Sequence, residues 1–226
     1  MSWFQLDPQS IASRTTAERP IPAIPSLGGS IVRGALGFTV MSIAGFIPWA
    51  IFGRTLYRAI GEVGMYLVCA AVFLVLSSLL LHRLIIGPGS RARFAKVFTI
   101  AFSVYSILWI VGWMAFKGHT GSIVGLLAGC AAMGLILAIA FDALPRAVPI
   151  IAALFVLNTI GYFVGGWVEA AVFKTHRVTA MLLWGVFYGL GLGAGLGVAF
   201  YLCQKKARDL IASGITPDTS PTRVES

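Results

Sequence analysis

Residues 184–200 read WGVFYGLGLGAGLGVAF, a stretch with six glycines and no charged residue. In water, a glycine inside a helix costs about 1 kcal/mol relative to alanine, and a strand so rich in glycine packs poorly. In lipid no hydrophobic force drives helices together, and glycines four residues apart form a flat surface on which a neighbouring helix can pack closely. The stretch therefore predicts a transmembrane helix with closely packed neighbours.

The composition of the whole chain supports a membrane protein. Of 226 residues, 58% are hydrophobic and 11% are charged, whereas soluble domains carry about 25% charged residues. Uncharged apolar stretches of about 20 residues are long enough to cross a bilayer as helices. The chain has six such stretches, at about 34–53, 63–81, 97–116, 121–141, 147–168 and 178–203. We predict an all-α, polytopic integral membrane protein with a bundle of six transmembrane helices.

The basic residues are distributed unevenly between the two predicted sides of the membrane. Residues 1–30 and 205–226 are polar and are predicted to be flexible tails that are disordered or lightly docked. Twelve of the seventeen Lys and Arg lie in or next to these tails, in the 82–96 loop or at Arg146, and five lie on the other side. Basic residues are retained in the cytoplasm, which predicts cytoplasmic termini, expected here at a bacterial inner membrane. The net charge of +9 favours anionic lipid headgroups as partners, and not nucleic acid.

Glycines four residues apart recur in the later spans and predict close helix packing. One row lies on a single face of residues 178–203, and Gly191 with Gly195 lies about 200° away around the same helix. Span six is therefore expected at the centre of a tight sub-bundle of spans four to six. The glycines concerned are Gly185, Gly189, Gly193 and Gly197 in span six, and Gly121, Gly125 and Gly129 in span four.

Enzymatic and cofactor motifs do not fit this chain. GLGLGA at 189–194 matches the dinucleotide pattern G-x-G-x-x-G/A, but that pattern requires a preceding strand in a soluble βαβ unit. Hydrolase and metalloprotease signatures do not occur, and the three cysteines lie singly in different spans. We therefore expect a protein that is not an enzyme and binds no metal or cofactor.

An internal repeat is a further prediction. Residues 29–54 align without gaps on 121–146, with eight of 26 positions identical. Each copy would contain three spans, so the second copy would be inserted upside down, as in many transporters. The alternative is chance, because apolar sequences draw on a restricted alphabet.

Charged residues lie at the ends of the predicted spans. Asp142 and Arg146 are four residues apart, so they can form a pair, or Arg146 can bind a lipid phosphate. Arg54, Arg58 and Glu62 repeat at the same spacing and can share one helix face. The alternative is that all of them anchor the chain at the membrane interface, where exposed ion pairs contribute little to stability.

Polar residues in span five predict a pathway across the membrane. Asn158 lies near the middle of the span, with Thr159 beside it and Tyr162 one turn later. Glu169 is eleven residues after Asn158, so both share a helix face about 16 Å apart. The alternative is a structural role, because interhelical hydrogen bonds in membranes contribute about 0.6 kcal/mol on average. Weaker candidates in other spans are Ser77, Ser78, Ser103, Tyr105 and Ser106.

Two classes of function remain. The first is a small transporter or channel, whose solute would be neutral or lipid-like because the span interiors lack the acidic residues that couple transport to protons or sodium. The second is a non-catalytic membrane subunit or scaffold, in a homo-oligomer or a larger complex, that docks partner helices on its glycine-rich faces.

Overall fold

The computed structural model describes residues 3–18 and 23–214, apart from the side chains of residues 62, 63 and 66. Within these residues the protein is 87% helix and has no strand. The elements are α1 (Pro8–Ala17), α2 (Leu27–Leu80), η1 (His82–Leu84), α3 (Ser90–Phe116), α4 (Gly118–Ala140), η2 (Leu144–Arg146), α5 (Ala147–Val172), α6 (Arg177–Cys203) and α7 (Lys205–Ala212). The prediction of an all-helical protein is confirmed.

Five helical segments of the described chain are long and apolar enough to cross a membrane. They are Leu27–Gly61, Ser90–Phe116, Gly118–Ala140, Leu144–Val172 and Arg177–Cys203. Such a set is characteristic of a multi-pass integral membrane protein. The predicted span at 63–81 corresponds to a shorter apolar helix, Leu67–Leu80, so the structure does not show the predicted six full-length spans.

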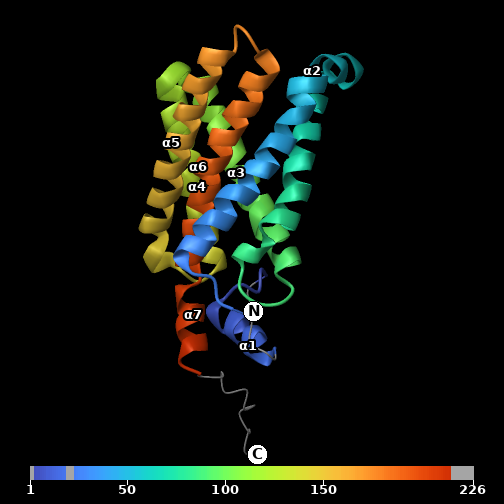
Figure 1. The fold of residues 1–226 in the computed structure, drawn as a ribbon. Coiled ribbons are helices and arrows are strands. Elements are labelled where there is room, and N and C mark those ends of the chain that lie inside the picture. The colour runs from blue at the N-terminus through green and yellow to red at the C-terminus, as the bar shows by residue number, and fades with distance from the viewer. Residues whose placement is uncertain (1–2, 19–22, 215–226) are drawn as a thin grey trace, which may run out of the picture.

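Helix α2 is a hairpin with two antiparallel arms (Figure 1). The reversal begins at Gly61, whose φ of 73° and ψ of 179° are not helical. Glycine adopts this backbone conformation without steric cost. Towards the other end of the hairpin, Gly45 of the first arm faces the ring of Phe73, and Gly37 faces Leu81. Because the reversal takes up part of the second apolar stretch, the second arm is short.

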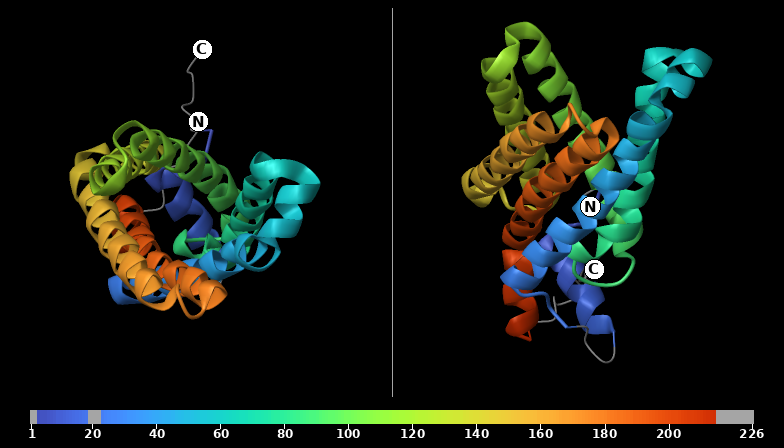
Figure 2. Two further views of the ribbon diagram at one scale, coloured as in Figure 1. Left: turned by 90° about the horizontal axis from the view of Figure 1, so that it is seen from above. Right: turned by 45° about the horizontal axis from the view of Figure 1, so that its top comes forward.

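The helices form a closed ring when viewed along the bundle (Figure 2, left). Neighbours in the ring follow the chain from α2 to α6, and α6 then packs against the first arm of α2. Aromatic side chains are prominent in the interior; the fully buried ones are Phe38, Phe94, Phe98, Phe141 and Phe200. The predicted inverted repeat remains a prediction, because the short arm Leu67–Leu80 is its counterpart to the long helix α5.

Helices α1 and α7 pack on each other at the end of the bundle that also carries η1 and η2 (Figure 1), which we call the basic end. Asp7 caps α1 by accepting a hydrogen bond from the Ser10 amide at 2.9 Å. Leu6 and Ile11 are fully buried. The predicted flexible tails therefore contain two packed helices, while residues 1–2, 19–22 and 215–226 lie outside the described residues.

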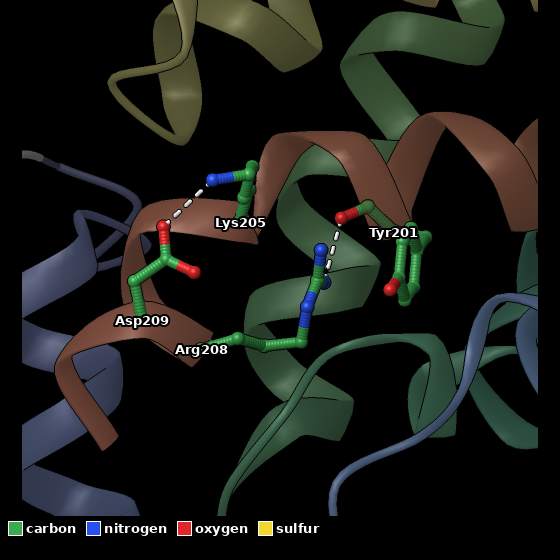
Figure 3. Close-up of polar contacts among 4 residues, drawn as sticks. All are labelled: Tyr201, Lys205, Arg208 and Asp209. Carbon is green, nitrogen blue, oxygen red and sulfur yellow. Dashed lines mark hydrogen bonds and ion pairs between the residues drawn. The ribbon is translucent and has the colours of Figure 1, made fainter. Parts of the chain in front are cut away.

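Polar contacts hold α7 at its place after α6 (Figure 3). The Arg208 guanidinium lies 3.6 Å from the centre of the Tyr201 ring and donates to the Tyr201 carbonyl at 2.6 Å. Lys205 and Asp209 form an ion pair at 2.9 Å, one turn apart on α7. The exposed ion pair contributes little, so the arginine stacked on the tyrosine is the stronger link.

The junction between α6 and α7 is also tied to the segment before α3. Gln204 is buried, and its amide nitrogen donates to the carbonyls of Leu84 and Phe200, both at 2.8 Å. Its side-chain oxygen accepts from the Ile86 amide at 2.8 Å. A buried amide that is satisfied on both atoms fixes the position of a loop, and the sequence alone does not indicate this role.

Candidate functional site

One glycine face of α6 packs directly on the first arm of α2. A Cβ added to Gly189 would lie 2.6 Å from the Thr39 Cα, and one added to Gly193 would lie 2.9 Å from the Ala35 Cα. Real Cβ atoms essentially never come so close to other atoms. The backbones of α6 and α2 therefore touch here only because residues 189 and 193 are glycines. The face consists of Gly185, Gly189, Gly193 and Gly197, and all four positions meet α2.

The second glycine face of α6 packs on α5. A Cβ at Gly191 would lie 2.7 Å from the Gly161 Cα, and one at Gly195 would lie 3.2 Å from the Leu154 Cα. Helix α6 thus has its most extensive contacts with α2 on one side and α5 on the other.

The glycine row of α4 faces α3. Cβ atoms at Gly121, Gly125 and Gly129 would meet the backbone of Trp113, Trp109 and Tyr105, respectively. Helices α4 and α6 touch only slightly. The predicted sub-bundle of spans four to six is therefore wrong, because span four packs on α3 instead. The reason is Gly112 on α3, where a Cβ would lie 2.6 Å from the Gly125 Cα; this residue lets α3 approach α4.

Asn158 lies inside the ring and is fully buried. Its Nδ2 donates to the Tyr105 hydroxyl at 2.9 Å, and the Tyr188 hydroxyl donates to the same oxygen at 3.4 Å. Cys130 Sγ is 3.6 Å from Nδ2. The Oδ1 atom of Asn158 has no hydrogen-bond partner among the described residues. We call Tyr105, Cys130, Asn158 and Tyr188 the polar cluster; its members come from α3, α4, α5 and α6.

Half-buried aromatic side chains lie next to the polar cluster, on the side away from the basic end. The Trp184 ring stacks on Tyr188 with centroids 5.4 Å apart and meets Phe46 and Tyr162 edge to face. Trp109 also meets Tyr162 at 6.1 Å, and the Tyr162 hydroxyl is 3.3 Å from Ser122 Oγ. We call Phe46, Trp109, Tyr162 and Trp184 the aromatic layer; they come from α2, α3, α5 and α6, respectively.

The remaining candidates of α5 lie on or beside its buried stripe. Buried positions recur at Leu154, Asn158, Gly161 and Gly165, and Glu169 follows four residues later, half-buried near the end of the helix. The Thr159 hydroxyl is buried and has no partner among the described residues. The structure therefore puts Asn158 and Glu169 on one side of α5 without bringing them into contact.

The predicted charge pairs have other surroundings. Asp142 pairs with Lys206 of α7 at 3.1 Å and not with Arg146. Helix α4 ends at Ala140 and η2 begins at Leu144, so residues 142 and 146 do not share a helix. Their four-residue spacing therefore does not bring the two side chains together. Arg54 and Arg58 are exposed on α2, and the side chain of Glu62 lies outside the described residues.

No family model, no curated protein and no solved structure matches this chain. Across the described residues, no group of three or more His, Cys, Asp or Glu side chains is placed to hold a metal ion. The polar cluster and the aromatic layer therefore form the candidate functional site. The sequence ranks Tyr105 only as a weaker candidate and does not single out Tyr188.

Proposed function

We propose that this protein is a small membrane transporter or channel for a neutral or lipid-like solute. The observation that carries the proposal is the unpaired Oδ1 of the buried Asn158. A buried acceptor without a donor costs about 1–3 kcal/mol. A solute that donates a hydrogen bond at this place would remove that cost, which favours a binding role for the polar cluster.

The chemistry of the site favours a solute without charge. The polar cluster offers hydroxyl, amide and thiol groups, and the aromatic layer offers four ring systems; none of these side chains is charged at neutral pH. A charged solute would lose its hydration without an opposite charge to compensate. A neutral solute with an apolar face and a hydrogen-bond donor suits both parts of the site.

The contacts of the glycine rows favour the transporter proposal over the scaffold alternative. A scaffold requires glycine-rich faces that are free to dock the helices of a partner protein. The rows in α4 and α6 instead meet α3, α2 and α5 of the same chain at backbone contact. A partner helix could use them only by displacing these neighbours.

A transport assay with defined probes tests the proposal. The purified protein is reconstituted into liposomes, and permeation of glycerol and urea is followed by osmotic swelling. Flipping of a fluorescent phosphatidylcholine is followed by dithionite quenching. We expect at least one probe to move at least about tenfold faster than in protein-free liposomes. Rates equal to those of protein-free liposomes for all three probes would contradict transport of this class of solute.

We further propose that the basic end faces the cytoplasm of a bacterium. Arg33, Arg83, Arg146 and Lys205 belong to this end, whereas Lys117 and Lys174 follow α3 and α5 at the other end. Basic residues are retained on the cytoplasmic side during insertion.

Cysteine labelling in intact cells tests this orientation. Thr120 and Ser213 are both exposed, at opposite ends of the bundle. A membrane-impermeant maleimide is expected to label Thr120→Cys well above the parent, which retains its three native cysteines, and to leave Ser213→Cys at the parent level. Labelling of Ser213→Cys alone would reverse the orientation.

A further inference from the structure

A cavity of about 250 Å³ lies at the basic end, where three segments of the chain meet. Arg33 contributes from the beginning of α2, His82 and Arg83 from the segment after its second arm, Gly87 from the loop before α3, and Ser90 from the beginning of α3. The cavity is separate from the polar cluster and from the aromatic layer.

The cavity has the lining of an anion site. Arg33 and Arg83 supply two guanidinium groups, and none of the described residues that line the cavity is acidic. Both ion pairs found in the described part of the chain involve lysines of α7, so neither arginine is neutralised by a carboxylate there. Arginine is well suited to phosphate because its planar fork of donors can bind two oxygens at once.

The backbone and the histidine add to this arrangement. Helix α3 begins at Ser90 with Gly89 as its N-cap, and no side chain caps its first amides. Free amides at a helix N-terminus favour a negatively charged group. His82 Nδ1 lies 2.9 Å from the Leu79 carbonyl, which directs the Nδ1 proton to that oxygen and leaves Nε2 for other contacts.

Exposed apolar side chains close in sequence to residues that line the cavity indicate the source of the anion. Val32 and Leu36 on the first arm of α2 are 55% and 60% exposed, and Leu79 at the end of the second arm is 47% exposed. They lie within three residues of Arg33 or His82 in the chain, Val32 and Leu36 on a helix long and apolar enough to cross a membrane and Leu79 on the shorter apolar arm Leu67–Leu80. A free phosphate ion would leave these apolar side chains uncovered, whereas the acyl chains of a lipid would cover them.

We propose that this cavity binds the phosphate group of an anionic phospholipid, with Arg33 and Arg83 as its main ligands. Basic pockets between transmembrane helices on the cytoplasmic side are a recurring form of lipid headgroup recognition. The bound lipid would link the beginning of α2, the end of its second arm and the beginning of α3. This site is independent of the proposed transport activity.

Lipid titration of two matched double variants tests the proposal. The full-length protein in phosphatidylcholine nanodiscs is titrated with phosphatidylglycerol, and retained lipids are counted by native mass spectrometry. R33Q/R83Q is expected to weaken phosphatidylglycerol binding about thirtyfold, since each arginine near the surface contributes about 1 kcal/mol. R54Q/R58Q, which removes the same charge near the reversal of the α2 hairpin at Gly61, is expected to bind like the parent.

Two further arms separate the possible outcomes. R33K/R83K retains the charge and is expected to bind more tightly than R33Q/R83Q, which shows that a loss in the latter does not come from misfolding. Equal weakening in R33Q/R83Q and R54Q/R58Q would overturn the site in favour of unspecific attraction. If 10 mM inorganic phosphate displaces phosphatidylglycerol from the parent, the ligand is free phosphate and the lipid assignment is overturned.

Discussion

Gly193→Leu is expected to prevent the protein from folding to a stable monodisperse form. A side chain at this position would meet the Ala35 Cα at 2.9 Å and the Phe38 Cβ at 2.7 Å, and the Gly34 carbonyl is nearer still. Overpacking of a core costs about 1–3 kcal/mol even where side chains can yield. Here backbone atoms are in the way, so we expect at least the upper end of that range. The measurement is the fraction of protein that elutes as one species from size exclusion after graded heating.

Gly166→Leu is the matched control for this prediction. Gly166 lies within an apolar helix of comparable length, and a Cβ there would meet no other atom within 4 Å. Its leucine variant is expected to melt within a few degrees of the parent. If Gly193→Leu and Gly166→Leu behave alike, α6 does not pack on α2 as the structure has it.

The sequence of residues 184–200 is sufficient to predict a membrane helix, but not the neighbours of its two faces. A row of glycines shows where close approach is sterically allowed on one helix. The partner is set by complementary small residues elsewhere, such as Gly34 opposite Gly193 and Gly112 opposite Gly125. These pairs are not marked by any local pattern, which is why span four was assigned to the wrong neighbours.

The two terminal helices illustrate a signal that the sequence does contain. Residues 7–10 form a typical helix start. Asp7 supplies a capping carboxylate that accepts from the Ser10 amide, and Pro8 is the proline of the first turn. The polar composition of residues 1–30 indicates a flexible tail instead. The packing of α1 on α7 is a contact between the two ends of the chain, and only the fold brings those together.

The polar cluster was predictable only in part. An amide in the middle of an apolar span has to find partners, and Asn158 does bond to Tyr105. The two tyrosines lie 53 and 30 residues away on other helices, and tyrosines in apolar spans also occur as simple packing residues. Helix rotation and depth decide which hydroxyl meets the amide, and neither can be read from spacing within one span.

Asn158→Leu is expected to abolish transport while leaving the protein folded. The change removes the hydrogen bond to Tyr105, worth about 0.5–1.5 kcal/mol, and a weaker one to Cys130 Sγ, together with an unsatisfied acceptor that costs about 1–3 kcal/mol. These contributions nearly cancel, so the melting temperature should stay close to that of the parent. The loss of the only buried amide oxygen that a solute could use in the polar cluster should reduce flux at least about tenfold. Flux of the fastest probe and thermal stability are measured on the same reconstituted protein.

Two further variants distinguish a binding role from a structural one. Tyr105→Phe removes the hydroxyl that accepts from Asn158 but keeps the ring, and it should lower flux less than Asn158→Leu, because Oδ1 remains available to the solute. Trp167→Phe changes a side chain of α5 that is 70% exposed, and it should leave flux unchanged. If the solute binds Oδ1, the flux of Asn158→Leu should fall while its melting temperature stays at the parental value. If Asn158→Leu instead transports at the parental rate, the amide only holds helices together and the pathway does not pass the polar cluster.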